Sequence, residues 1–176
     1  QVMMMQGHAL RKISSLELDY LINNYSAVSD ATAYSYMLGG HPMYQINFPS
    51  ELKSWLYDGS TDMWTRLESG LAGGRHRGEI LVDYINKPRV FDYENGNIYT
   101  MDADTYTDNG TIIPREITSK HFHSGGGRLT VNKLQVDFET GVGLISGQGS
   151  DPQAMLTYSK DNGHTWSAEL WVTLGA

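Results

Sequence analysis

Residues 159–166 read Ser-Lys-Asp-Asn-Gly-His-Thr-Trp and match the eight-residue pattern S-x-D-x-G-x-T-W, the Asp box, at every fixed position. An Asp side chain accepts hydrogen bonds from backbone N–H groups just downstream, and a glycine two positions later supplies the positive φ of a tight turn. A β-branched residue and an aromatic then suit the start of the next strand. The pattern therefore predicts a hairpin whose fixed positions are Ser159, Asp161, Gly163, Thr165 and Trp166.

Asp boxes are similar to turns that recur in β-propeller blades, including those of sialidases, where they usually face away from the active centre. A motif needs its structural context before it implies chemistry. We therefore interpret this one as a folding element with no catalytic residue.

The chain begins with a helical pattern and continues with strands. In residues 13–25 the apolar positions Ile13, Leu16, Tyr20 and Leu21 follow a helical spacing. Ser14 or Ser15 is a suitable N-cap, and Glu17 stands near the first turn. We expect a short helix of two to three turns within an N-terminal segment, residues 1–30.

Three sets of four strand candidates follow, separated by turn residues. The sets span residues 31–70, 71–124 and 128–176, with a linker at Gly125-Gly126-Gly127 before the last. The candidates are residues 33–38, 43–48, 54–58 and 63–67; 79–84, 89–93, 97–101 and 111–118; and 128–138, 142–146, 154–159 and 165–172. Four short strands per repeat are typical of propeller blades.

The predicted fold class is all-β: a partial or incomplete β-propeller of four-stranded antiparallel blades, with an Asp-box hairpin and one short N-terminal helix. All three sets would belong to one propeller-like domain. Because closed propellers use about four to eight blades, three blades would need an open edge, a partner or further sequence.

Composition excludes several classes of function. The net charge of −7 opposes direct, non-specific DNA binding, which depends on Lys and Arg releasing counterions from phosphates. The absence of cysteine excludes disulfides and the common structural zinc sites. The sequence contains no run of 18 apolar residues, which a membrane-spanning helix would require. The basic run at residues 75–77 and the acidic stretch at 92–110 are interpreted as solvated loops.

Two clusters are candidates for metal binding. Asp102, Asp104 and Asp108 supply oxygen ligands in one loop, but the glycine and terminal Glu of an EF-hand are missing, so a plain turn is the favoured interpretation. His121 and His123 share a strand face, without Cys or a nearby carboxylate to complete a site. We predict no metal and no cofactor.

Several blocks occur in a fixed order along the chain. They are residues 40–44 (Gly-His-Pro-Met-Tyr), 55–58 (Trp-Leu-Tyr-Asp) before Trp64, 74–77 (Gly-Arg-His-Arg), 92–99 (Asp-Tyr-Glu-Asn-Gly-Asn-Ile-Tyr), 102–110 (Asp-Ala-Asp-Thr-Tyr-Thr-Asp-Asn-Gly), 139–143 (Glu-Thr-Gly-Val-Gly) and 161–166. In this order and spacing the chain resembles the packaged-DNA stabilisation proteins of short-tailed bacteriophages and looks like a fragment of a longer family member.

The resemblance implies a non-enzymatic virion protein of the phage or prophage head-to-tail connector, in the neck and tail hub. Such a tail accessory protein helps close the portal channel and retain packaged DNA, with no direct DNA binding and no membrane contact. Implied partners are a portal or adaptor ring, a tail needle or tailspike, and further copies of the full-length protein in a ring. Its location would be the virion, after assembly in the bacterial host cytoplasm.

Two alternatives remain at the level of sequence. A sialidase-like glycoside hydrolase would explain an Asp box on a propeller, but none of the seven arginines lies in a recognisable sialidase motif. A glycan-binding propeller module would explain the many aromatics, which include 11 Tyr and 4 Trp. Packing between sheets is the favoured interpretation of those aromatics.

Overall fold

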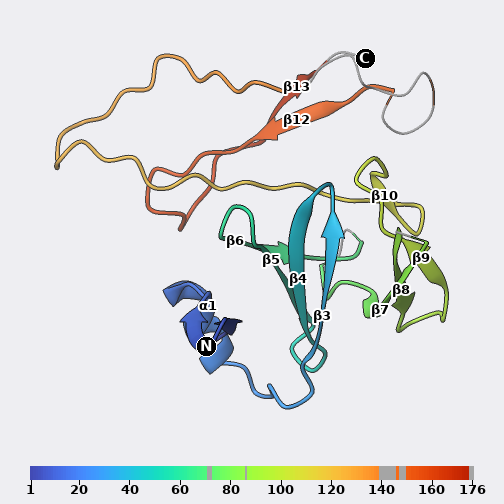
Figure 1. The fold of residues 1–176 in the computed structure, drawn as a ribbon. Coiled ribbons are helices and arrows are strands. Elements are labelled where there is room, and N and C mark those ends of the chain that lie inside the picture. Colours follow the sequence, from blue (N-terminus) through green and yellow to red (C-terminus); the bar gives the residue numbers. More distant parts are fainter. Residues whose placement is uncertain (71–72, 86, 139–145, 147–149, 175–176) are drawn as a thin grey trace. The chain divides into compact units, whose positions relative to one another are not determined.

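The computed structural model describes residues 1–70, 73–85, 87–138, 146 and 150–174 (Figure 1). They form two compact units, residues 1–116 and residues 117–176. One short helix accompanies several small antiparallel sheets, so the prediction of an all-β chain with a short N-terminal helix is confirmed. Within this described part, no helix is both long and apolar enough to cross a membrane.

A hairpin opens the first unit. β1 (Met3–Gln6) pairs antiparallel with β2 (Ala9–Lys12), and Gly7 adopts a positive φ of 63° in the turn between them. The sequence does not predict this hairpin, because the three consecutive methionines of β1 hide the alternation of apolar and polar residues that marks a half-buried strand.

The helix α1 (Leu16–Asn23) lies within the predicted range 13–25. Ser15 is its N-cap and accepts a hydrogen bond from the Leu18 N–H at 3.1 Å. Asp19 connects the helix to the hairpin: its carboxylate lies 2.5 Å from the ammonium of Lys12 and accepts a hydrogen bond from the Ser14 hydroxyl. The N-terminal segment is therefore held together by a half-buried charge pair as well as by apolar contact.

Four strands follow and form an antiparallel sheet in chain order: β3 (Thr32–Leu38), β4 (His41–Phe48), β5 (Lys53–Asp58) and β6 (Met63–Leu67). All four strands predicted within residues 31–70 are present. The turn between the first two contains Gly39 and Gly40, both at positive φ, as the sequence indicates.

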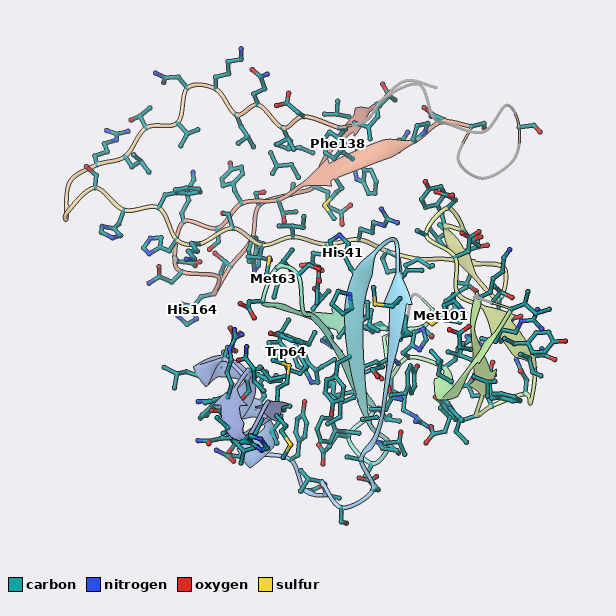
Figure 2. All side chains as sticks on the ribbon, in the orientation of Figure 1. His41, Met63, Trp64, Met101, Phe138 and His164 are labelled. Carbon is teal, nitrogen blue, oxygen red and sulfur yellow. The ribbon has the colours of Figure 1, made fainter. Side chains whose placement is uncertain are left out.

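One face of this sheet is aromatic. Trp55 and Tyr57 are two positions apart in β5 and therefore lie on the same face. Trp64 in β6 lies opposite Tyr57, and the centroids of their rings are 5.2 Å apart. The N-terminal segment packs here. Trp64 projects from β6 and donates a hydrogen bond to the carbonyl of Ile13 at 2.7 Å (Figure 2), and Trp55 donates one to the hydroxyl of Tyr25 at 3.0 Å.

The buried side of α1 differs from the predicted apolar stripe. Leu16 and Tyr20 are 83% and 70% exposed, whereas Leu18 is only 2% exposed. The predicted set therefore included two wrong positions. The reason is tertiary: Leu18 and Leu21 are the apolar residues of α1 that face the tryptophans of the sheet.

The opposite face of the sheet contains three buried polar side chains. Gln45, Asn47 and Ser54 are each 0% exposed. The Asn47 side-chain oxygen accepts hydrogen bonds from Gln45 at 3.0 Å and Ser54 at 2.7 Å, while its amide nitrogen donates to the Gly78 carbonyl at 3.0 Å. Ser54 in turn accepts a hydrogen bond from the His76 N–H at 2.9 Å. We call Gln45, Asn47, Ser54, His76 and Gly78 the inter-sheet network.

His76 is neutral in this network. Its Nδ1 accepts hydrogen bonds from the Gly78 N–H and from the Gln45 amide, each at 3.1 Å, and burial lowers its pKa below the ordinary value. Gly78 is required for close approach, since a Cβ there would lie 2.9 Å from the Tyr34 hydroxyl and 3.0 Å from the Val90 Cβ. Gly78 is also the first residue of the second sheet, so these contacts lie where the chain enters that sheet.

The second sheet contains β7 (Gly78–Tyr84), β8 (Lys87–Asp92) and β9 (Ile98–Thr100), again antiparallel and in chain order. The predicted fourth strand, residues 111–118, does not join it. Instead β10 (Thr107–Asp108) and β11 (Thr111–Ile112) form a separate two-stranded hairpin. Pro114, two residues after the end of β11, lacks an N–H group and so prevents a longer paired strand.

In the second unit, β12 (Gln153–Leu156) pairs antiparallel with β13 (Leu170–Thr173). Both lie at predicted strands, but residues 165–169 are not part of β13. The predicted strand at 128–138 is wrong: the described residues there have no strand partner. Of the predicted strand at 142–146, residues 142–145 lie outside the described part. The glycine linker forms a tight turn, in which the Gly127 N–H donates to the Ser124 carbonyl at 2.7 Å.

We expect Asn47→Ala to lower the free energy of unfolding by about 2–3 kcal/mol, because Gln45, Ser54 and Gly78 each lose one buried hydrogen bond. Chemical denaturation of the chain measures this change. The control is Asn23→Ala at the exposed end of α1, which should alter stability by less than about 0.5 kcal/mol. Equal losses in both variants would contradict the role of the network.

Candidate functional site

The turn at residues 159–166 has a dense set of internal hydrogen bonds. The two carboxylate oxygens of Asp161 accept hydrogen bonds from the Thr165 N–H at 2.8 Å and the Thr165 hydroxyl at 2.6 Å. The Ser159 hydroxyl donates to Asp161 at 2.8 Å and accepts from the Gly163 N–H at 2.7 Å. Asn162 and Gly163 both adopt positive φ, 60° and 87°. Four of the five fixed positions, all except Trp166, are thus connected by these hydrogen bonds.

These bonds determine the charge of Asp161. The hydrogen bonds from Thr165, followed by the one from Ser159, lower its pKa to about 2. Asp161 is therefore ionised at neutral pH, and its oxygens are already occupied by donors of its own turn. A carboxylate held this way stabilises a loop and is poorly suited to exchange protons with a substrate.

The structure does not assemble the calcium candidates into one site. Asp102 accepts a hydrogen bond from the Thr105 hydroxyl at 3.1 Å within its own turn, and Asp108 lies 2.8 Å from Nε of Arg77. Asp104 contributes its backbone N–H to Asp102. The rings of His121 and His123 lie 6.1 Å apart. Within the described residues, no group of three or more His, Asp or Glu side chains is placed to hold a metal ion.

The basic run at 75–77 is largely buried, so its interpretation as a solvated loop is wrong. Arg77 pairs with Asp92 at 2.6 Å as well as with Asp108. Although burial opposes its charge, these two carboxylates raise the pKa of Arg77. Arg75 is ion-paired with Glu79, and its guanidinium lies 3.6 Å from the ring centroid of Tyr93. Ion pairs with carboxylates therefore balance the positive charge of both arginines.

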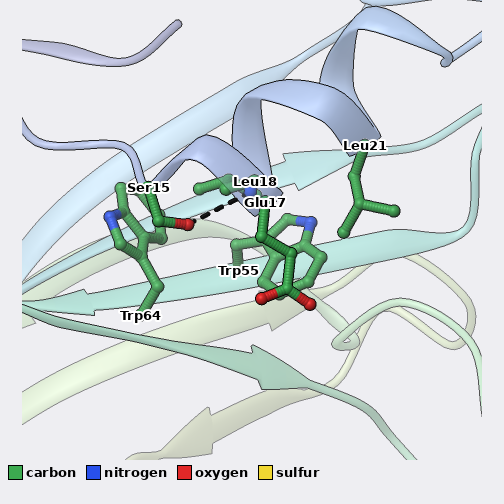
Figure 3. A pocket seen from close by; sticks show the side chains of 6 residues that line it. All are labelled: Ser15, Glu17, Leu18, Leu21, Trp55 and Trp64. Atoms are coloured by element: carbon green, nitrogen blue, oxygen red, sulfur yellow. Dashed lines mark hydrogen bonds between the residues drawn. The ribbon is translucent and has the colours of Figure 1, made fainter. Parts of the chain in front are cut away.

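A cavity of about 200 Å³ lies between α1 and the aromatic face of the first sheet (Figure 3). Trp55 and Trp64 line it from the sheet, and the residues that line it from the helix side are Ser15, Glu17, Leu18 and Leu21. A second cavity of similar volume borders the arginines, and its lining includes Ser69, Gly73, Arg75, Tyr93 and Glu94. The arginines at this second cavity already face carboxylates, which disfavours binding of an anion there.

The sequence did not indicate either cavity. Both depend on residues from distant segments, and Glu17 in particular stands about forty to fifty positions from the tryptophans it faces. The predicted helical spacing included Leu21, which lines the first cavity, but also Leu16 and Tyr20, which are exposed and do not line it.

Comparisons with known proteins give two matches. A family model described as "Bacteriophage P22 Gp10, beta-propeller" matches residues 1–106, and one described as "Bacteriophage P22 Gp10, beta-sandwich" matches residues 114–176. No curated protein and no solved structure matches the chain.

The two matches together define a structural protein of a bacteriophage. The chain belongs to the phage P22 Gp10 family of DNA stabilisation proteins. The resemblance seen in the sequence is confirmed, and the propeller class is the one that the first model names. The second model describes residues 114–176 as a β-sandwich, whereas the sequence suggested a third blade at 128–176.

The hydrogen bonds of the folded turn favour the ionised form of Asp161. We therefore expect Asp161 to stabilise the second unit above about pH 4, and this stabilisation to decline as the pH falls toward about 2. Carboxyl-carbon NMR titration measures the pKa directly.

Asp161→Ala should speed hydrogen exchange at the Thr165 amide, whereas His164→Ala, at a position of the same turn that the pattern leaves variable, should not. An ordinary pKa near 4 would contradict the bonded turn.

Proposed function

We propose that this chain is part of a virion protein of the phage head-to-tail connector, the neck and tail hub, which helps to close the portal channel and retain packaged DNA. The observation that carries the proposal is the pair of family matches, which together cover nearly the whole chain. In this proposal the protein acts through protein–protein contacts and has no catalytic residue.

The charge distribution supports a seal rather than a DNA clamp. The net charge is −7, and within the described residues five of the 13 Lys and Arg side chains are paired with carboxylates, Lys12 with Asp19 among them. Arg11 lies 2.7 Å from Asp62, Arg66 pairs with Glu68, and Arg75 and Arg77 are paired as described above. Phosphate binding would have to break such pairs or overcome the surplus of acids.

The outer face of the second sheet supports assembly with other protein surfaces. Ile80, Phe91 and Ile98 lie opposite each other on β7, β8 and β9 and form an apolar row across the sheet. All three are exposed, Ile80 to 60%. On the covered face Val90 is only 2% exposed. Exposed contiguous apolar patches mark interaction sites, and we infer that another sheet covers this row in the assembled protein.

The second unit supports the same inference. Leu156 and Leu170 are cross-strand partners, as are Met155 and Trp171, and all four side chains are exposed. A two-stranded ribbon with apolar residues on both faces is marginal by itself. We propose that it belongs to the sandwich named by the family match, and that the turn at 159–166 acts as a structural Asp box in it.

The proposed partners are the portal or adaptor ring, a tail needle or tailspike, and further copies in a homo-oligomeric ring. The proposed location is the virion, reached after assembly in the host cytoplasm. We further propose that the two sheets of the first unit are propeller blades, the first with four strands and the second with three described ones.

We expect the chain to form no complex with duplex DNA at physiological salt, because its 20 acidic residues outnumber its 13 Lys and Arg and repel the phosphates. Fluorescence anisotropy with a labelled duplex measures this directly. A complex of micromolar affinity that weakens steeply with salt would contradict the proposed mechanism.

The connector role itself is tested by genetic complementation. Phage particles that lack the protein should package DNA and then lose it, and the wild-type gene should restore the nuclease-resistant DNA. Ile80→Asp should fail to restore it, because a carboxylate in the apolar row opposes covering by a second surface. Val28→Asp is the matched control, an aliphatic residue 49% exposed outside the sheets. Full DNA retention without the protein would contradict the role.

A further inference from the structure

The cavity under α1 combines two indole walls with one unpaired carboxylate. Trp55 and Trp64 line it from the sheet, and Glu17 faces them from the first turn of the helix (Figure 3). Glu17 is exposed and makes no hydrogen bond or ion pair with any described residue. The nearest basic residues in the sequence do not neutralise it, since Lys12 is paired with Asp19 and Arg11 with Asp62.

The remaining polar groups of the cavity are already engaged. The indole N–H of Trp55 donates to Tyr25 and that of Trp64 donates to Ile13. The Ser15 hydroxyl oxygen accepts the N-capping bond. A saccharide needs several free donors and acceptors around it, and the Glu17 carboxylate is the one side-chain acceptor of this cavity that no described residue engages.

We propose that this cavity is a binding site for a basic side chain, arginine or lysine, presented by a neighbouring protein. The aliphatic stem of such a side chain would pack against Leu18, Leu21 and the indoles, and its cationic head would lie against the rings and pair with Glu17. Arginine is the better fit, because its planar guanidinium stacks on aromatic faces and pairs with a carboxylate at the same time.

Charge complementarity favours the same kind of partner. A chain with a net charge of −7 attracts basic surfaces over long range, and a shaped aromatic cavity then adds a specific contact. Buried tryptophan and arginine are also the residues that contribute most often to interface energy. The identity of the neighbour as a virion protein rests on the proposed connector role, whereas the chemistry of the cavity does not.

The test uses the full 176-residue chain and a small probe, N-acetyl-arginine methylamide. Its uncharged counterpart, the citrulline derivative, has nearly the same shape. Proton–nitrogen NMR follows the indole N–H signals of Trp55 and Trp64, and those of Trp166 and Trp171 in the second unit serve as internal references. The arginine probe should shift the first pair of signals with millimolar affinity, at least about threefold tighter than citrulline.

Glu17→Gln should weaken binding of the arginine probe to the level of the citrulline probe, and Glu94→Gln, at the other cavity, should leave it unchanged. Raising the salt from about 50 mM to about 500 mM should weaken binding to the wild-type chain, a measurement that requires no variant. Equal binding of both probes, no shift of either indole, or a shift caused only by a saccharide such as methyl N-acetylglucosaminide would overturn the proposal.

Failure of this site and failure of the connector role are distinguishable. If the probe binds while particles lacking the protein retain their DNA, the site stands and the role falls. If the probe does not bind while complementation depends on the wild-type gene, the role stands and the site falls. Complementation by Glu17→Gln then reports whether the virion uses the cavity: reduced DNA retention supports this, and full retention overturns the assignment of the partner to the virion.

Discussion

The inter-sheet network is the interaction on which the first unit depends. Asn47 lies at its centre and hydrogen-bonds to Gln45, Ser54 and the backbone of Gly78, whereas the buried Oε1 of Gln45 has no partner among the described residues. Because unpaired buried polar groups are costly, these hydrogen bonds favour the placement of the two sheets that forms them and penalise others. The close approach at Gly78 adds a steric requirement to the electrostatic one.

Because of this arrangement, the two faces of the first sheet contact different parts of the chain. Because the polar face is occupied by the network, the aromatic face remains for the N-terminal segment, which attaches through Trp55 and Trp64. The attachment is incomplete and leaves the cavity with Glu17 at its edge. The outer face of the second sheet remains apolar and exposed at Ile80 and Phe91. Both features are the surfaces to which the proposed partners would bind.

Local patterns in the sequence predicted the elements that depend on neighbouring residues. The N-cap at Ser15, the turn at Gly39-Gly40 and the bonded turn around Asp161 each arise from contacts within a few positions. The prediction failed where pairing over distance decides. Residues 128–138 alternate like a strand but have no strand partner, and the basic run at 75–77 looks solvated until Asp92 and Asp108 are placed beside Arg77.

The sequence by itself determined the all-β class, the short helix, the acidic charge and the phage family, because composition, turn chemistry and the order of motifs are encoded along the chain. Only the tertiary structure decided which side of α1 is buried, that Gln45 bonds to His76 and Asn47 to Gly78, and that Glu17 faces two tryptophans. The physical reason is that burial and polar pairing depend on distances between residues tens of positions apart, which periodicity and local propensity do not contain.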